Sequence, residues 1–275
     1  MKSLSPSPYL KNNVRRDALH PPLSEKTVSV VGLGGTADVA LDLLKSGVTK
    51  FRLFDFDALE SGNLVRHACG SRYVGTNKAE ATKLLLEEYC GHELPDAVAV
   101  SKDVFSPESG FESAVRESDL VIVGTDTDAS RAYVNDLAVE TGTPTVYASM
   151  FENGCGGEIF AYRPGGCCYG CLMLHQERHE FLEKYQKTAH KPDCSSSRDV
   201  RSMPGIGIDQ RFLSAIASRL SLDTLLEGSN HSLPKIGSNW IVFSVSGISE
   251  ILETPLSSLR FEMDPHPQCR CRQYG

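Results

Sequence analysis

A short glycine-rich segment near the start of the sequence is the first feature whose residue types suit chemistry. Its glycines are Gly32, Gly34 and Gly35. The segment directly follows an apolar, β-branched run at 27–31 and precedes a run with helical spacing of apolar residues. Small residues at a strand-to-helix turn let the backbone approach a phosphate, and a helix N-terminus favours negative charge. Asp55 ends the next expected strand about 20 residues further on, where a carboxylate can bond a ribose hydroxyl. These features predict nucleotide binding but do not separate NAD from ATP.

Charged and polar residues follow Asp55 and add to this chemistry. They are Asp57, Asn63, Arg66, Lys78 and, further along, Asp126. Their types could serve phosphate or metal binding, but composition and spacing alone do not assign them that role. Taken singly, however, an arginine or a lysine is usually a solvated surface charge. Asp126 could equally cap the helix expected after it.

The cysteines are the second chemical feature. The chain has nine, which is more than a cytosolic protein usually carries, and they are unevenly placed. Cys168 and Cys171 form a C-x-x-C pair, and Cys269 and Cys271 form a C-x-C pair near the C-terminal end. A disulfide framework is typical of small secreted chains, whereas clustered cysteines in an intracellular protein more often bind metal. The alternative is two unrelated pairs of reduced cysteines.

The elements that must position these residues alternate between strand-like and helix-like patterns. Strands are expected at 27–31, 50–54, 97–100, 119–124 and 144–149. Helices are expected at 78–88, 113–117 and 129–140, in addition to the one after the glycine turn. Such alternation is typical of a parallel sheet with helices on both faces. A sheet of this kind binds its ligand beyond the carboxyl ends of its strands, where the glycine turn and Asp55 would lie.

The C-terminal half follows a different pattern. A strand is expected at 158–162, a long amphipathic helix at 208–226, and an antiparallel pair at 240–245 and 259–263. The predicted fold class is therefore α/β, with a Rossmann-like, mostly parallel sheet and helices on both faces, extended by antiparallel strands in the C-terminal half. Residues 1–26, which contain four prolines, are predicted to form an arm ahead of this fold.

Composition and charge exclude several classes of protein. Of the 275 residues, 40% are hydrophobic and 23% are charged, which is ordinary for a globular chain. The net charge of −7 and the lack of a strongly basic stretch argue against direct nucleic-acid binding. No apolar run approaches the roughly 20 residues that a membrane span needs. The start of the sequence also lacks the apolar core of a signal peptide, so we expect a cytoplasmic protein.

Several spaced motifs together resemble one known family. They are the D-x-D of 55–57, the N-L-x-R of 63–66, the G-x-x-K of 75–78, and an aspartate followed five residues later by an arginine at 126–131. In this order they resemble the ThiF/MoeB/HesA family, which includes the catalytic domain of ubiquitin-activating enzymes. The resemblance covers about residues 27–275. It implies ATP-dependent adenylation of the C-terminal carboxylate of a ubiquitin-like or sulfur-carrier protein that ends in Gly-Gly.

The resemblance also implies roles for individual residues. Arg66 and Lys78 would lie on the phosphates of ATP, with Asn63 as a polar positioner beside them. Asp126 would hold Mg²⁺, Asp55 the ribose, and Asp57 the loop or the metal.

Within residues 27–275, the resemblance implies a nucleotide-binding half at 27–150 and a carrier-binding and zinc half at 151–275. The four cysteines Cys168, Cys171, Cys269 and Cys271 would bind one structural Zn²⁺, although the C-x-C spacing departs from the usual second C-x-x-C pair.

Two further implications concern acyl transfer and assembly. Cys194 lies in a polar loop, and a cysteine in the matching loop of some relatives forms a thioester or acyl-disulfide with the activated carrier. Basic residues around it would favour a thiolate, and the alternative is an exposed, inert cysteine. Most relatives are dimers, so a homodimer is expected, in which Arg15 or Arg16 could reach the partner's active site.

Three alternatives remain at this stage. The chain could be a non-catalytic partner subunit with the same fold, but such subunits usually lose the phosphate-binding arginine, lysine or aspartate that this chain keeps. It could adenylate a small-molecule, peptide or tRNA-linked carboxylate instead of a carrier protein. It could also be an NAD-dependent oxidoreductase, although no residue marks the proton donor that such an enzyme needs.

Overall fold

The computed structural model describes most of the region predicted to fold. The described residues are 19, 21–90, 94–151, 154, 156–188, 206–245 and 252–273. Three residues with expected roles, Arg15, Arg16 and Cys194, lie outside them. Among the described residues, no helix is both long and apolar enough to cross a bilayer.

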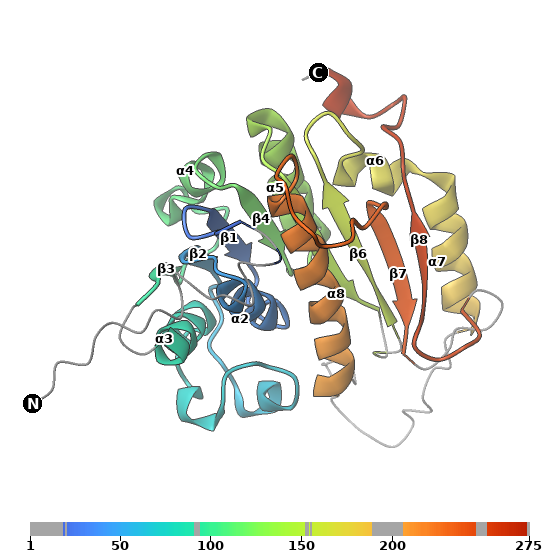
Figure 1. Ribbon diagram of the computed structural model, residues 1–275. Coiled ribbons are helices and arrows are strands. Elements are labelled where there is room, and N and C mark those ends of the chain that lie inside the picture. Colours follow the sequence, from blue (N-terminus) through green and yellow to red (C-terminus); the bar gives the residue numbers. More distant parts are fainter. Residues whose placement is uncertain are drawn as a thin grey trace, which may run out of the picture.

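One eight-stranded sheet runs through the molecule in the order β3-β2-β1-β4-β5-β6-β7-β8 (Figure 1). Its strands are β1 (Thr27–Val31), β2 (Lys50–Phe54), β3 (Asp96–Val100), β4 (Leu120–Val123), β5 (Thr145–Met150), β6 (Gly156–Tyr162), β7 (Trp240–Ser244) and β8 (Ser257–Phe261). Strands β3, β2, β1, β4 and β5 pair in parallel, and β6, β7 and β8 continue the sheet in antiparallel fashion. The predicted fold class is thereby confirmed.

Two groups of helices cover the two faces of this sheet (Figure 1). One face carries α2 (Thr36–Lys45), α3 (Lys78–Cys90) and α8 (Gly207–Leu225). The other carries α4 (Phe111–Arg116), α5 (Asp128–Thr141), α6 (Tyr169–Leu174) and α7 (Gln176–Thr188). The described residues also form short 3₁₀ turns: η1 (Ser61–Val65), η2 (Ser71–Tyr73), η3 (Pro107–Ser109) and η5 (Arg270–Gln273).

Alternation along the buried strands explains the two-faced packing. In β1, Val28 and Val30 join the cluster under α2, α3 and α8, whereas Val31 joins the cluster under α4 to α7. In β4, Leu120 and Ile122 face the first cluster and their neighbours face the second. Because successive side chains of a strand point to opposite faces, a run of apolar residues is buried on both sides.

The last strand ends two residues before the predicted boundary. Trp240 of β7 pairs with Phe261, and this register ends the ladder there. Beyond it, the side chain of Asn239 takes over: its amide donates to Met263 O at 2.8 Å and its Oδ1 accepts from Met263 N at 2.8 Å. A side chain thus replaces the partner strand at this edge, which an apolar sequence pattern does not reveal.

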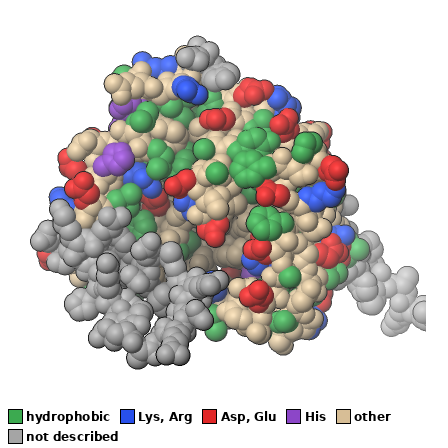
Figure 2. All heavy atoms as spheres, turned by 180° about the vertical axis from the view of Figure 1, so that it is seen from behind, with side chains coloured by type: hydrophobic (Ala, Val, Ile, Leu, Met, Phe, Trp, Pro, Cys, Tyr) green, Lys and Arg blue, Asp and Glu red, His purple; other side chains and the backbone are tan. Residues whose placement is uncertain are grey.

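Charges of both signs are interspersed on the face shown in Figure 2, with exposed apolar side chains in small patches between them. A nucleic-acid backbone is bound by clustered lysines and arginines. The visible, described part of this face carries no such cluster.

Candidate active site and metal centre

A cavity of about 720 Å³ lies beyond the carboxyl ends of β1, β2 and β4. All nine residues predicted for the nucleotide site line it: Gly32, Gly34, Gly35, Asp55, Asp57, Asn63, Arg66, Lys78 and Asp126. The cavity occupies the place at which parallel α/β sheets bind ligands. The structure thus brings the predicted residues together, although their roles stay predictions.

The glycine turn leaves no room for a side chain where it lies against the loop after β4. Gly32 has a φ of +76°, and a Cβ there would lie 2.9 Å from the backbone nitrogen of Thr125. A Cβ on Gly124 would lie 2.4 Å from Cγ2 of Thr36, whose hydroxyl donates to Gly32 O. These contacts bring the turn and the start of α2 tightly against the loop after β4.

Asp55 holds the backbone of the glycine turn. Its Oδ2 accepts from Leu33 N at 2.6 Å and its Oδ1 accepts from Asp57 N at 2.9 Å. Burial raises the pKa of Asp55, while these two N–H groups and the ammonium of Lys78 act in the opposite direction. A carboxylate oxygen has further lone pairs, so this arrangement leaves Asp55 able to accept a ribose hydroxyl as well.

Lys78 is fixed at the N-terminus of α3 beside Asp57. Its ammonium lies 2.8 Å from Asp57 Oδ2, and its backbone N–H donates to Asp57 O at 2.8 Å. Asn77 caps the same helix by accepting from Ala79 N at 2.9 Å, and its amide donates to Asp55 O at 2.8 Å. The end of β2 and the start of α3 are therefore one connected unit.

The 3₁₀ turn η1 places Asn63 and Arg66. Asn63 Oδ1 accepts from Glu60 N at 2.9 Å, and Asn63 O accepts from Arg66 N at 3.0 Å. Asn63 therefore caps the turn as well as lining the cavity. Its local role explains the spacing of asparagine and arginine in the N-L-x-R sequence, because one turn of helix separates them.

Asp126 lies exposed on the loop after β4, where it lines the cavity. Thr127, rather than Asp126, caps α5, since its hydroxyl accepts from Ser130 N at 3.2 Å. Arg131 donates to Thr125 O from Nε at 2.9 Å and from Nη2 at 2.6 Å, and so holds the backbone that precedes Asp126. The aspartate–arginine spacing thus combines an exposed carboxylate with an anchor for its loop.

Other cavity residues were not predicted from the sequence. Gln210 of α8 covers Gly35, where a Cβ would lie 1.8 Å from its Nε2, and Ser214 donates to Gly35 O at 2.9 Å. His67 is buried behind the glycine turn, and its Nε2 lies 2.6 Å from Leu33 O. The sequence carries one weak signal for His67, its position directly after Arg66, and none for Gln210 or Ser214.

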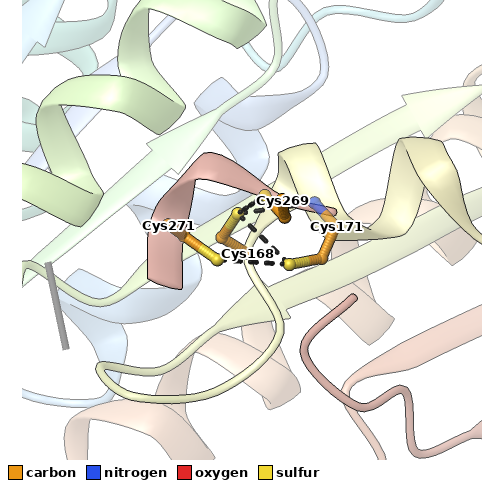
Figure 3. A group of neighbouring side chains, drawn as sticks. All are labelled: Cys168, Cys171, Cys269 and Cys271. Carbon is orange, nitrogen blue, oxygen red and sulfur yellow. Dashed lines mark hydrogen bonds between the residues drawn. The ribbon is translucent and has the colours of Figure 1, made fainter. Parts of the chain in front are cut away.

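The two cysteine pairs form one cluster at the other end of the molecule (Figure 3). The Sγ atoms of Cys168 and Cys171 are 3.7 Å apart, Cys168 and Cys269 are 3.6 Å apart, and Cys171 and Cys271 are 3.3 Å apart. Thiolates on a tetrahedral zinc, with bonds of about 2.3 Å, lie about 3.8 Å from one another. The four thiols therefore fit a tetrahedral metal ion, and Cys167 is not among them.

Without a cation, the electrostatics of this cluster favour neutral thiols at two of its four positions. Burial raises the pKa of the Cys168 thiol and that of the Cys271 thiol. Because burial disfavours the charged form, thiolates at these positions require a compensating positive charge. A coordinated metal ion supplies that charge and deprotonates the thiols outright.

The chain matches the ThiF family over residues 12–244, which is most of its length. It therefore belongs to the ThiF family.

Relatives in other organisms are consistent with this membership. An adenylyltransferase and sulfurtransferase UBA4 from Yarrowia lipolytica is 34% identical over 154 residues, which make up 55% of this chain and 37% of that protein. A SAMP-activating enzyme E1 from Haloferax volcanii is 27% identical over 186 residues, covering 66% of this chain and 63% of that protein. This chain thus spans less than half of the first relative and less than two thirds of the second.

The fold is also that of a solved enzyme. The structure of E. coli MccB with ATP covers 90% of this chain and 67% of MccB, with a TM-score of 0.63 and 20% identity. At this identity the likeness establishes the fold alone.

Proposed function

We propose that this chain uses ATP to adenylate the C-terminal carboxylate of a ubiquitin-like or sulfur-carrier protein that ends in Gly-Gly. The observation that carries the proposal is the gathering of Asp55, Arg66, Lys78 and Asp126 around one cavity at the glycine turn. Relatives named as adenylyltransferases and as an activating enzyme support the reaction class.

The proposed reaction joins the carrier carboxylate to the α-phosphate of ATP and expels pyrophosphate. Such a step needs no covalent chemistry from the protein, only an in-line arrangement and neutralised charge. Asp55 binds the ribose, the N-terminus of α2 faces the phosphates, and Arg66 and Lys78 neutralise them. Lys78 pairs with Asp57 at the cavity, which keeps its ammonium in place for a phosphate.

Two metal ions belong to this proposal. Asp126 would hold Mg²⁺, because this ion is usually bound by one or two carboxylates together with substrate phosphates. The ion would neutralise phosphate charge. The four-cysteine cluster would hold Zn²⁺ in a closed structural site with no open position for chemistry.

The carrier and the later steps are proposed on the family relationship. Residues 151–275 would bind the carrier, and the thiolate of Cys194 would attack the acyl-adenylate, forming a thioester and releasing AMP. The enzyme would act as a cytoplasmic homodimer, with Arg15 or Arg16 of one protomer completing the other's site. Cys194, Arg15 and Arg16 lie outside the described residues, so these parts rest on the sequence.

The test is ATP–pyrophosphate exchange measured with a panel of carboxylates. We expect exchange to depend on a carrier with a free Gly-Gly terminus and to cease when that terminus is amidated. Exchange driven by a short peptide or a small acid would replace the carrier with that substrate. A folded protein that exchanges pyrophosphate with none of them would be a scaffold subunit, and the proposal would be wrong.

A further inference from the structure

We propose that His67 is a positioning residue of the nucleotide site, which in its neutral form holds the Leu33 peptide of the glycine turn in its phosphate-binding orientation. The inference rests on the proposed function for the identity of the nucleotide. Its geometry is independent of which carboxylate is adenylated.

The hydrogen bonds of His67 fix its tautomer. Cys69 N donates to His67 Nδ1 at 3.0 Å, and His67 Nε2 lies 2.6 Å from Leu33 O. A backbone N–H can only donate, so Nδ1 carries the lone pair and the proton is on Nε2. His67 therefore donates to the Leu33 carbonyl, and the ring is neutral when both bonds are made.

Both backbone polar groups of Leu33 are consequently hydrogen-bonded. Its N–H donates to Asp55 at the end of β2, and its C=O accepts from His67 in the loop after η1. In a planar trans peptide the C=O and the following N–H point in opposite directions. The bond to Leu33 O therefore also sets the direction of the Gly34 N–H, and Gly34 lines the cavity.

The same two bonds position Arg66. His67 follows Arg66 directly, and its ring ties the segment 66–69 to the glycine turn. A predicted phosphate cation and a predicted phosphate-binding turn are thus connected through one imidazole. Loss of the ring's polar atoms would release both at once.

Burial is the main cause that keeps His67 neutral. Burial lowers its pKa, the hydrogen bond to Leu33 acts in the opposite direction, and the ammonium of Lys78 on α3 lowers the pKa further. Asp55 accepts from the Leu33 N–H while His67 binds the Leu33 carbonyl, and Arg66 and Cys69 lie on the same segment as His67. An imidazolium has no lone pair to accept from Cys69 N, so protonation removes one of the two anchors.

The test compares His67→Gln with His67→Phe in the full chain. Glutamine has a donor and an acceptor that can replace both bonds, whereas phenylalanine keeps a ring of similar size and has neither. We expect His67→Phe to weaken the binding of Mg²⁺-ATP about tenfold, because Leu33 O loses its buried donor. We expect His67→Gln to stay within about threefold of the wild type, at most about half of that effect in free energy. Calorimetric titration gives the affinities, and thermal melting confirms that each variant is folded.

The pH profile separates positioning from mere packing. Wild-type affinity for ATP should be constant above about pH 6.5, the ordinary histidine pKa, and should fall at more acidic pH as the lowered pKa is passed. His67→Gln should lack this part of the acid loss, while the titration of Asp55 and of ATP itself is common to both proteins.

The outcomes distinguish this inference from the proposed function. If folded His67→Phe binds ATP with the same affinity as the wild type, the inference is overturned and the proposed function stands. If His67→Phe does not fold, the pH profiles decide. Wild type and His67→Gln that lose ATP affinity identically at acidic pH would overturn the inference. Wild type that binds no ATP would overturn the proposed function, and this inference with it.

Discussion

The nucleotide cavity and the four-cysteine cluster reach their geometry in opposite ways. In the cavity, unlike groups hold one another: Lys78 pairs with Asp57, and Asp55 accepts from the backbone of the glycine turn. In the cluster, four like groups lie 3.3–3.7 Å apart along their measured contacts, on segments about a hundred residues apart in sequence. The cavity is organised by contacts between its own residues, whereas we propose that a bound cation holds the cluster together. Removing a ligand should therefore affect the two regions very differently.

The largest effect should follow loss of the metal. Cys168→Ser, or treatment with a strong chelator, should lower the free energy of unfolding by about 5 kcal/mol, less than the 10–16 kcal/mol of isolated zinc-finger peptides because a folded sheet supports this site. Urea unfolding and metal analysis of the purified protein measure this. Cys167→Ala is the matched control, since Cys167 is buried beside the cluster but outside it, and it should cost about 1 kcal/mol. Equal losses in both variants would contradict a metal site.

A buried ion pair in the C-terminal half should stabilise the protein independently of the cysteine cluster. Arg178 of α7 makes two hydrogen bonds to Glu158 of β6, at 2.6 and 3.2 Å, and Trp240 donates to the same carboxylate at 3.1 Å. This part of the C-terminal half is held together by its own side chains. Glu158→Gln should lower the free energy of unfolding by about 4 kcal/mol, because it leaves a buried guanidinium uncompensated.

The matched control for that ion pair is Glu140→Gln, which removes an exposed partner of Arg116. It should cost no more than about 1 kcal/mol. Comparable losses for Glu140→Gln and Glu158→Gln in urea unfolding would show that the buried pair has no special weight.

Substitution of the two cations of the cavity should lower activity and leave stability nearly unchanged. Arg66→Ala and Lys78→Ala should each lower the rate of pyrophosphate exchange about 100- to 1,000-fold, because each removes a charge that stabilises the reacting phosphates. Their melting temperatures should change little. Lys83→Ala on the same helix as Lys78 is the control, since Lys83 lies beside Glu87 on α3 and is absent from the cavity lining. Exchange that survives in Arg66→Ala or Lys78→Ala would remove these residues from the mechanism.

The smallest effect should come from the glycine turn. Gly32→Ala combines a φ of +76° with a close contact to Thr125, and should cost about 2 kcal/mol of stability and weaken ATP binding. Gly142→Ala, at a φ of +67° with open space around it, shares only the backbone cost of about 1 kcal/mol. The difference between the two in urea unfolding isolates the close approach. If they are equal, the space at Gly32 is not limiting.

Local patterns in the sequence were sufficient for the fold, the glycine turn and Asp55, whereas Asn63, Arg66, Lys78 and Asp126 were expected from the family resemblance. The glycine turn, Asp55 and Lys78 lie on consecutive elements of one βαβ unit and its next helix, so their meeting follows from the topology of a parallel sheet. Likewise, the alternating apolar residues of β1 and β4 are buried as their patterns predict.

The contacts that the sequence did not reveal depend on tertiary packing. The pattern of α8 shows that one side of this helix is apolar, but not that Gln210 and Ser214 lie against Gly35. The hydrogen bond between His67 and Leu33 joins two loops. Hydrophobic periodicity in the sequence does not predict how two loops lie relative to each other. The meeting of the two cysteine pairs was expected from family resemblance rather than from spacing, and the structure brings the thiols together.

The most direct measurement of the central claim follows the label of ATP in the presence of a Gly-Gly carrier. With ATP labelled at the α-phosphate, the account predicts that the label passes to the carrier as an acyl-adenylate, that unlabelled pyrophosphate is released, and that Lys78→Ala prevents both. Release of ADP with no label on the carrier, or binding of NAD⁺ in place of ATP, would contradict it.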